Sequence, residues 1–335
     1  MDRGDDESSR ARLFKLLNER AGQTVPGSYL TEKLECSRQA VFKLVAALRG
    51  EGIGITSEQQ KGYRLESYEN SDALSPTLLD FLLDGNPLFH KCLCFEELPS
   101  TQIIIKKLAA QDAPQGVVAA ADSQTEGRGR RGRGWQAPAG RNLSFSMLLR
   151  PNLRPGEVQM LNLAAGIAVR RTIERYYNLK TELKWPNDVL CGGRKLCGIL
   201  SEAAGEPDRI YYAVTGVGLN VNLRAEDISA DICDIATSLL IETGAPVPRT
   251  MLLARLLDEF AALVLDLDSP GGAARLMASY KSECDTIGKR VLVLQDGAEF
   301  RGTAEGVTEQ GALIVNINEN MKTFAAADVQ HLRRA

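Results

Sequence analysis

Histidine is scarce in this chain of 335 residues, because only His90 and His331 occur and they lie far apart in the sequence. A Ser-His-Asp triad needs a histidine beside its nucleophile, and zinc sites commonly use histidine ligands. Both kinds of site are therefore disfavoured. The P-loop pattern G-x-x-x-x-G-K-[ST] is also missing from the sequence, which excludes that way of holding a nucleotide.

Long apolar runs are absent as well. No stretch of 18 apolar residues occurs, so no membrane-spanning helix is expected. The polar, acidic start of the chain does not read as a signal peptide. The seven cysteines are an odd number without framework spacing, which favours reduced thiols in the cytoplasm. Cys92 and Cys94 lack a second pair, so core packing is favoured over zinc.

An excess of positive charge is lacking, since 40 Lys and Arg face 43 Asp and Glu. Any nucleic-acid site must therefore be a local patch. Hydrophobic content of 44% and charged content of 25% are ordinary for a globular protein. The length allows two or three domains, and we expect three, over residues 1–66, 67–283 and 284–335.

The pattern of residues 1–66 predicts a winged helix-turn-helix. Three amphipathic helices and two extended segments are expected over residues 10–19, 28–34, 38–49, 53–56 and 62–65. Ser28 and Ser37 are good N-caps for the second and third helices. The third helix would enter a major groove while the hairpin lies on phosphates. The candidate DNA contacts are Ser37, Arg38, Gln39, Lys43, Lys61 and Arg64. The alternative is a small helical domain whose charges are only solvated.

Residues 67–75 are polar and predict a linker. The region after them predicts an α+β domain with a mostly antiparallel or mixed sheet, because several strands precede and follow one long helix over residues 158–177. Strands are expected over residues 92–96, 117–121, 142–149, 183–190, 195–202 and 211–222. Helices are expected over residues 102–111 and 251–267. Four short strands between residues 288 and 324 predict a small C-terminal barrel.

The segment Gly127–Gly134 contains four glycines and four arginines. Glycine lets a ligand approach the backbone closely, and arginine offers a charged fork that suits phosphate and carboxylate. A flexible loop that closes over an anion is therefore expected. The alternative is an RNA-binding tail, which Trp135 and the apolar stretch over residues 143–149 argue against.

Three further features of the central region point to a bound ligand. Ser100 and Thr101 follow a strand and precede a helix, where a cap is locally favoured over a ligand contact. Lys195 follows a Gly-Gly turn and would need an anionic partner if buried, although a solvated lysine is favoured from local pattern alone. Gly198, Gly216 and Gly218 would let a ligand lie flat on the sheet.

These motifs occur in one order along nearly the whole chain: Ser100-Thr101, Gln124, Gly127–Arg133, Lys184–Asp188, Lys195–Leu200 and Gly216–Asn222. In this the chain resembles the bacterial biotin protein ligases. With its winged helix it is similar to their bifunctional form, the biotin operon repressors. The resemblance implies a central domain like class II aminoacyl-tRNA synthetases and an SH3-like C-terminal barrel.

The resemblance also implies an activity. Biotin and ATP would give biotinoyl-5′-adenylate, and biotin would pass to a lysine of a biotin carboxyl carrier protein, the acetyl-CoA carboxylase subunit, or of another biotin-dependent carboxylase. Mg²⁺ would accompany ATP, held mostly through phosphates and water and not by a protein metal site. Operator DNA and a ligand-promoted homodimer are the other implied partners.

Site residues follow from the same resemblance. Lys195, Arg130 and Asp188 would be catalytic. The implied biotin contacts are Ser100, Thr101, Gln102, Gln124, Gly127, Arg128, Arg130, Lys195 and Gly198. The implied adenylate contacts are Arg128, Arg130, Arg131, Arg133, Trp135, Asn187, Lys195, Asn220 and Arg333. Gln102 departs from the asparagine that is usual in the family, and Arg333 could instead belong to a basic tail.

Three alternatives stay open. A lipoate or octanoyl ligase shares the fold, although the arginine-rich loop favours biotin. A repressor that senses biotin without catalysis is disfavoured by the intact Lys195 and Asp188. A ligase whose N-terminal domain serves only for packing is the third.

Overall fold

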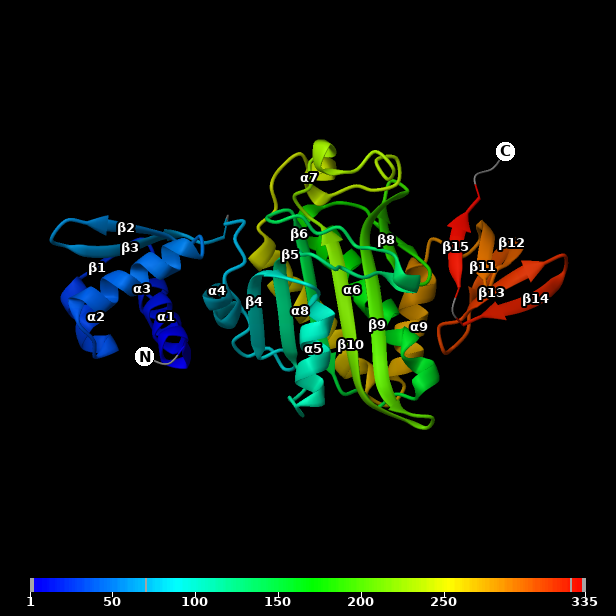
Figure 1. Ribbon diagram of the computed structural model, residues 1–335, viewed down its shortest axis with the longest axis horizontal. Coiled ribbons are helices and arrows are strands. Elements are labelled where there is room, and N and C mark those ends of the chain that lie inside the picture. The colour runs from blue at the N-terminus through cyan, green and yellow to red at the C-terminus, as the bar shows by residue number, and fades with distance from the viewer. Residues whose placement is uncertain (1–2, 70, 326, 333–335) are drawn as a thin grey trace.

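Three regions follow one another along the long axis of the computed structural model, which describes residues 3–69, 71–325 and 327–332 (Figure 1). The N-terminal helices lie at one end and the C-terminal strands at the other, with a large sheet between them (Figure 1). Within those residues no helix combines the length and apolarity needed to cross a bilayer.

The first region is a winged helix-turn-helix, as the sequence predicts. It comprises α1 (Arg3–Asn18), β1 (Thr24–Val25), α2 (Gly27–Leu34), α3 (Arg38–Gly50), β2 (Gly54–Glu58) and β3 (Gly62–Ser67). The strands form a sheet in the order β1-β3-β2. The apolar face of α3 is buried against the other elements through Val41, Leu44, Val45 and Leu48, because residues at this spacing share one face of a helix.

The two predicted N-caps have different outcomes. The Ser37 hydroxyl accepts a hydrogen bond from Ala40 N at 3.1 Å and caps α3. The prediction for Ser28 is wrong, because α2 begins one residue earlier and Pro26 holds the N-cap position without a side-chain bond. Proline has its φ fixed near the value found here, −60°, so the chain enters the helix at this point.

The segment after the wing ties the first two regions together. Helix α4 (Pro76–Leu82) puts Leu78 into the core of the first region and Leu79 into the core of the second. Glu51, at the end of α3, accepts hydrogen bonds from the hydroxyls of Ser75 at 2.6 Å and Thr77 at 3.0 Å. A buried carboxylate with several donors is well satisfied, so residues 67–75 are anchored at their end.

The central region is built on a seven-stranded mixed sheet in the order β4-β5-β6-β10-β9-β8-β7, in which β4 and β5 are parallel and the other neighbours antiparallel. This confirms the predicted mixed sheet. The strands are β4 (Lys91–Leu98), β5 (Val117–Gln124), β6 (Asn142–Leu149), β7 (Glu182–Lys184), β8 (Asp188–Cys191), β9 (Arg194–Glu206) and β10 (Arg209–Asn220).

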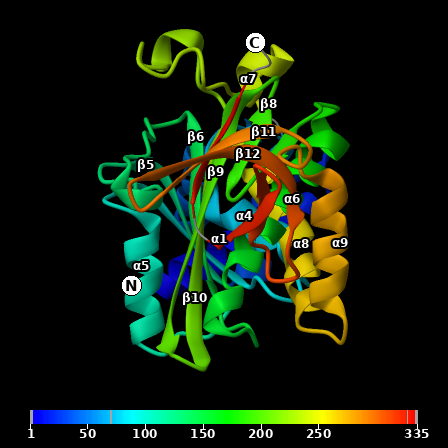
Figure 2. The same cartoon turned by 90° about the vertical axis from the view of Figure 1, so that its right-hand side faces the viewer.

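Helices cover both faces of this sheet. Helix α5 (Thr101–Ala110) lies on one face, and α6 (Gln159–Tyr177), α8 (Arg249–Leu267) and α9 (Gly272–Glu283) lie on the other (Figure 2). The short α7 (Leu239–Thr243) follows a long loop. Neither α7 nor α9 was predicted from the sequence.

Strand β10 shows how the sheet creates a site. Successive side chains of a strand point to opposite faces. Val217 and Leu219 belong to the core under α6 and α8, and Val214 packs with α5. On the α5 face beyond that helix come Gly216, Gly218 and Asn220, which line a cavity. The alternation therefore puts two glycines, Gly216 and Gly218, on a flat floor beside the N-terminal end of α5.

The third region is an antiparallel sheet in the order β14-β13-β12-β11-β15. Its strands are β11 (Arg290–Gln295), β12 (Ala298–Val307), β13 (Leu313–Ile317), β14 (Asn320–Phe324) and β15 (Asp328–His331). Four were predicted. The fifth, β15, was missed because it is short and mostly polar. Arg333 lies outside the described residues.

Trp185 joins this sheet to the central region. Its indole Nε1 donates to Gly311 O at 2.8 Å, and its backbone N donates to Thr286 Oγ1 at 3.0 Å. The side chain is 1% exposed and belongs to a buried cluster that also contains Val291 and Phe324 of the C-terminal strands. The C-terminal sheet and the central region therefore share one core.

His331 makes this junction sensitive to acid. Thr286 Oγ1 accepts from Trp185 N, so its hydrogen can be donated to His331 Nε2, 3.0 Å away, only while Nε2 is unprotonated. Burial, followed by Lys289 and Lys184, lowers the pKa of His331 from 6.5 to about 4. Below pH 6.5 the imidazole of His331 takes up a proton in the unfolded chain, whereas in the folded chain it does so only near pH 4. The free energy of unfolding therefore falls as the pH decreases from 6.5 towards 4.

We expect the free energy of unfolding in urea to drop by about 2 kcal/mol more between pH 7.5 and 4.5 in the wild type than in His331→Gln, at roughly 1.4 kcal/mol per pKa unit. The exposed His90→Gln variant is the matched control and should follow the wild type. Equal pH dependence of His331→Gln and wild type would contradict the assignment.

Candidate functional site

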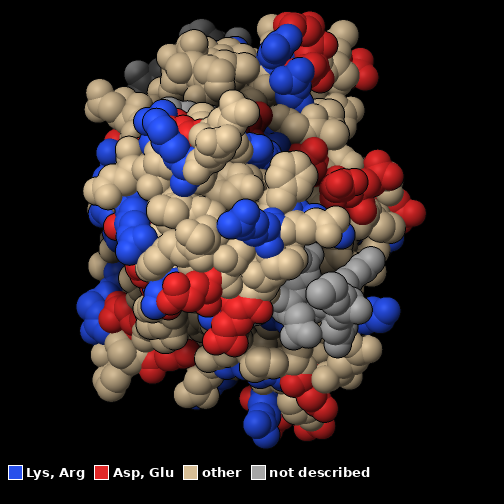
Figure 3. Space-filling model, turned by 90° about the vertical axis from the view of Figure 1, so that its left-hand side faces the viewer, with Lys and Arg blue, Asp and Glu red and all other residues tan. Residues whose placement is uncertain are grey.

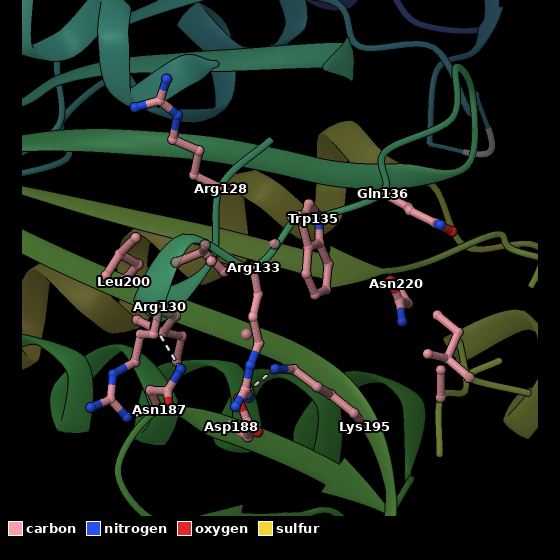
Figure 4. A pocket seen from close by; sticks show the side chains of 18 of the residues that line it. Arg128, Arg130, Arg133, Trp135, Gln136, Asn187, Asp188, Lys195, Leu200 and Asn220 are labelled. Atoms are coloured by element: carbon pink, nitrogen blue, oxygen red, sulfur yellow. Dashed lines mark hydrogen bonds and ion pairs between the residues drawn. The ribbon is translucent and has the colours of Figure 1, made fainter. Parts of the chain in front are cut away.

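A cavity of about 740 Å³ opens on the α5 face of the sheet. The ends of β5, β8, β9 and β10 form it together with the glycine–arginine loop, the loop before α7 and the start of β15. Figure 4 shows side chains from the loop and from the sheet directed into it. Distant parts of the chain therefore build a single site.

Two glycines on the floor of the cavity are required by close contacts. A Cβ atom on Gly218 would lie 2.4 Å from Cε2 of Trp135, and one on Gly216 would lie 2.6 Å from Nε2 of Gln102. Any larger residue at these positions would displace the Trp135 ring or the Gln102 amide. The Trp135 indole N–H is buried and has no hydrogen-bond partner among the described residues, so the ring packs on Gly218 with an unsatisfied donor.

The start of α5 is capped by Gln124 of β5 and not by its own serine. Gln124 Oε1 accepts from Thr101 N at 2.8 Å. Ser100 occupies the N-cap position, yet its side chain makes no hydrogen bond in the described part of the chain. The local expectation of a serine cap is therefore wrong, and the Ser100 hydroxyl lines the cavity unused. Gln102 also lines the cavity, and its amide donates to Leu200 O at 2.8 Å.

The glycine–arginine loop folds back on itself as a narrow hairpin. Trp135 N donates to Gly127 O at 2.8 Å, and Gly129 N donates to Arg133 O at 2.7 Å. A Cβ on Gly127 would lie 2.4 Å from Trp135 O, so this approach needs glycine. The alternative of an unstructured RNA-binding tail is therefore wrong.

Three loop arginines gather around Asp328 at the start of β15. Arg133 Nη2 lies 2.5 Å from Asp328 Oδ2, and Arg130 and Arg131 lie 3.9 Å from the same carboxylate. Arg130 also donates to Ala327 O at 3.1 Å, and its burial lowers the pKa of its guanidinium. Arg128 points away from these arginines (Figure 4) and lies 3.7 Å from Glu126.

The Asp328 carboxylate occupies the place among the loop arginines where the anion of a ligand could bind. Its side chain is 13% exposed, lines the cavity and receives the guanidinium groups that suit a phosphate. An incoming anion would therefore meet arginines that are already gathered.

Lys195 faces the loop from the opposite side of the cavity. Its Nζ lies 2.7 Å from Asp188 Oδ1 and 5.9 Å from the centroid of the Trp135 ring (Figure 4). A Cβ on Gly198 would lie 3.1 Å from Lys195 Cε, so the lysine stem runs over that glycine. Lys195 thus has the anionic partner that a partly buried lysine requires. Burial lowers the pKa of the neighbouring Lys184, and Asp188 opposes this shift.

The two asparagines of the site are held by the backbone. Asn187 donates to Ile199 O at 3.1 Å and accepts from Arg130 at 3.3 Å, so both ends of its amide are in use. Asn220 donates to Thr237 O at 2.9 Å. Asn187 therefore connects the loop to β9, while the Asn220 side chain lines the cavity.

Part of the wall was not predicted from the sequence. Asp328, Gln330, Gln136, Asp231 and Ile235 all line the cavity. Lys195 N donates to Ile235 O at 2.7 Å, and Thr237 N donates to Lys195 O at 2.9 Å, so the loop before α7 pairs with the start of β9. No local pattern in the sequence indicates this pairing.

A metal site formed by protein side chains is not seen. The described residues contain no group of three or more His, Cys, Asp or Glu that could hold an ion. The Asp188 carboxylate is an oxygen donor in the cavity, yet it is paired with Lys195. A divalent cation would fit here only with most of its ligands supplied by phosphates and water.

The outer face of α3 is the candidate nucleic-acid interface. Arg38, Gln39 and Lys43 are exposed there, while the Ser37 hydroxyl is used in the cap. In the wing, Lys61 and Arg64 both pair with Glu58, and Arg64 also donates to Glu66 at 2.8 Å. Seen from this end of the molecule, basic and acidic side chains are interspersed (Figure 3). Binding at this face would therefore depend on individual contacts more than on overall charge.

Three family models match successive parts of the chain. An HTH domain matches residues 10–64, the biotin/lipoate A/B protein ligase family matches residues 94–220, and the biotin protein ligase C terminal domain matches residues 286–332. These ranges contain the α3 face, the glycine–arginine loop and β15, respectively.

Relatives match over nearly the full length. The chain is 32% identical over 321 residues to the bifunctional ligase/repressor BirA of Bacillus subtilis (strain 168), which covers 96% of this chain and 98% of the relative. It is 39% identical over 264 residues to the biotin--[acetyl-CoA-carboxylase] ligase of Mycobacterium tuberculosis (strain ATCC 25618 / H37Rv), covering 77% and 95%. The biotin protein ligase from Aquifex aeolicus in complex with biotin and ATP superposes with a TM-score of 0.63 at 28% identity, covering 73% of this chain and 100% of that chain.

Proposed function

The chain belongs to the biotin/lipoate A/B protein ligase family, in its bifunctional ligase/repressor form, and we propose that the cavity joins biotin to ATP and passes biotin to a carrier lysine. The observation that carries this proposal is the convergence of two cationic groups. Lys195 approaches from β9 and the arginines approach from the loop, over a floor of glycines.

In the first step a biotin carboxylate oxygen attacks the α-phosphorus of ATP, and the bond to the β-phosphate breaks as pyrophosphate leaves. Both reactants are anions, so their repulsion opposes the approach. Lys195 would lie between the carboxylate and the α-phosphate, and Arg130, Arg131 and Arg133 would take the phosphate in place of Asp328. Preorganised charges of this kind stabilise the transition state without an acid–base residue.

Biotin itself would lie along the glycine floor. The free hydroxyl of Ser100, the Thr101–Gln124 pair and the backbone of Gly127, Arg128 and Gly198 would hold its polar groups, with Gln102 beside them. Trp135, with its unpaired N–H, would cover the ligand. Asn187, Asn220 and Arg333 would contact the nucleotide.

In the second step the amine of a carrier lysine attacks the carbonyl carbon of the mixed anhydride, and the bond to AMP breaks. Asp188 would orient the incoming amine and accept its proton. The loop excludes water from the anhydride until then. The proposed acceptor is a biotin carboxyl carrier protein. Mg²⁺ would accompany ATP, held mostly by the phosphates and water.

The winged helix makes the chain a transcriptional repressor in this family. We propose residues 1–66, 67–283 and 284–335 as its three domains. Bound adenylate would promote a homodimer, and two copies of α3 would then match a palindromic operator, with Arg38, Gln39 and Lys43 at the bases and Lys61 and Arg64 at the phosphates. The proposed compartment is the cytoplasm, where the free cysteines stay reduced.

Biotin transfer tests the ligase. The full-length protein, biotin, ATP and Mg²⁺ are incubated with a purified biotin carboxyl carrier domain, and mass spectrometry should show the addition of one biotin to one lysine. Lipoate in place of biotin should give no product. Transfer of lipoate but not of biotin would replace this function with that of a lipoate ligase.

A gel shift tests the repressor separately. Retardation of DNA upstream of the organism's biotin genes should require biotin and ATP together, and sedimentation should show a larger species under the same conditions. Retardation that responds to neither substrate would reject the proposed switch while leaving the ligase intact.

A further inference from the structure

Phe42 is an exposed aromatic residue in the second turn of α3. Its side chain is 60% exposed, whereas phenylalanine is among the residues most often buried. The ring makes no aromatic or cation–π contact with any described residue. Ring contacts among the described residues therefore give no reason for an aromatic group here.

The position of Phe42 on the helix places it among the candidate DNA contacts. It follows Arg38 by four residues and Gln39 by three, so the three side chains are neighbours on one helix surface. The buried stripe of α3 runs through Val41 and Val45 and borders Phe42 on one side, while Gln39 lies on the other. Lys43 is also exposed. The ring is thus framed by polar and basic side chains near the N-terminal end of the helix.

An exposed ring with polar and basic neighbours is better suited to contact DNA than to contact a protein partner. The N-terminal part of a recognition helix meets base edges in the major groove, with basic residues on the flanking phosphates. In that groove the donor and acceptor groups of the bases are polar, and the 5-methyl group of thymine is the apolar feature. A single exposed ring bounded by Arg38, Gln39 and Lys43 is complementary to such a methyl group.

We propose that Phe42 contacts the 5-methyl group of a thymine in each half-site of the operator and so helps to determine which sequence is bound. The inference rests on the proposed DNA-binding function of α3 and adds a residue and a base to it. Arg38 and Gln39 would hydrogen-bond to neighbouring base edges. Phe42 would add an apolar contact to the thymine methyl group, which cytosine does not have.

The experiment begins with duplexes selected from a random library of about 40 base pairs by the full-length protein in biotin, ATP and Mg²⁺, a length that spans two half-sites one helical turn apart. Each thymine of the enriched duplex is then replaced in turn by deoxyuridine, which removes only the methyl group. At one thymine per half-site the wild type should bind about fourfold more weakly, the factor expected for one buried carbon.

Phe42→Ala should lose affinity for the thymine duplex and bind the thymine and deoxyuridine duplexes equally well. Phe42→Leu, which keeps an apolar side chain, should recover part of the sensitivity. Biotin transfer to the carrier domain should be unchanged in both variants, which shows that the ligase region folds, and the remaining affinity of Phe42→Ala for the deoxyuridine duplex shows that the winged helix folds. Tyr176→Ala, at an exposed aromatic residue of α6, is the matched control and should keep the wild-type deoxyuridine profile.

Four outcomes would overturn the inference. If no deoxyuridine substitution weakens binding by the wild type, or if the same substitutions weaken binding by Phe42→Ala as they do in the wild type, the methyl contact is rejected while DNA binding stays intact. A change in the mass of the Phe42→Ala protein in light scattering, with no change in the profile, would make Phe42 a protein-contact residue. Failure of the library to enrich any sequence would reject the DNA-binding function itself.

Discussion

Replacing Lys195 by glutamine is expected to lower the rate of pyrophosphate release from biotin and ATP by about 10²–10³-fold, the usual loss when a preorganised charge is removed from a transition state. Glutamine keeps most of the length and a donor but not the charge. Lys195 is the cation that reaches the cavity from the sheet side, 2.7 Å from Asp188 and over Gly198. Without it, the repulsion between carboxylate and α-phosphate is opposed by the loop arginines and by Lys184, which also lines the cavity.

Lys106→Gln is the matched control for this experiment. Lys106 lies on α5 and pairs with Glu202 at 2.8 Å on an exposed surface, so its replacement should change the rate less than twofold. The measurement is a coupled pyrophosphate assay at saturating biotin and ATP. A Lys195→Gln protein that retains the wild-type rate while melting normally would remove Lys195 from the adenylation step.

Replacing Arg130 by glycine is expected to release the adenylate before transfer. The Arg130 guanidinium donates to Asn187 and to Ala327 O, so it fixes the loop against both β9 and the C-terminal sheet. Its loss removes a charge from the phosphate and also loosens the loop. Charged hydrogen bonds contribute about 1.5–3 kcal/mol, so the escape rate should rise roughly ten- to a hundredfold.

Escaped adenylate reacts with any exposed lysine. Bystander labelling is measured by incubating the enzyme with biotin, ATP and serum albumin and probing the albumin with streptavidin. Arg154→Gly, at an exposed arginine away from the cavity, should label albumin no more than the wild type does. If Arg130→Gly labels no more than Arg154→Gly while still releasing pyrophosphate, the proposed role of Arg130 in retention is wrong.

Local pattern was enough for much of the fold. The apolar spacing of α3 and α6 predicted both helices, and alternation with turn signals predicted most strands of the mixed sheet. The composition of Gly127–Gly134 alone predicted a loop that binds an anion. These features follow from propensity and periodicity over a few neighbouring residues, so they are readable without the tertiary structure.

Pairings between residues far apart in the chain needed the structure. The capping of α5 by Gln124 replaced the expected Ser100 cap and left that hydroxyl free for a ligand. Arg64 of the wing proved to be paired with Glu58 and Glu66. In each case a side chain had two plausible local roles, and the choice depended on which distant partner the fold placed beside it.

The sequence by itself determined the three modules and the kinds of group at the site, namely flat glycines, a lysine and clustered arginines. Only the tertiary structure decided that Asp328, about two hundred residues beyond the loop, gathers those arginines, and that Trp185 holds the two sheets in one core. A short polar strand such as β15 carries no local signal. The Asp328 carboxylate matters because the fold brings it within ion-pair distance of three arginines, which suit a phosphate equally well.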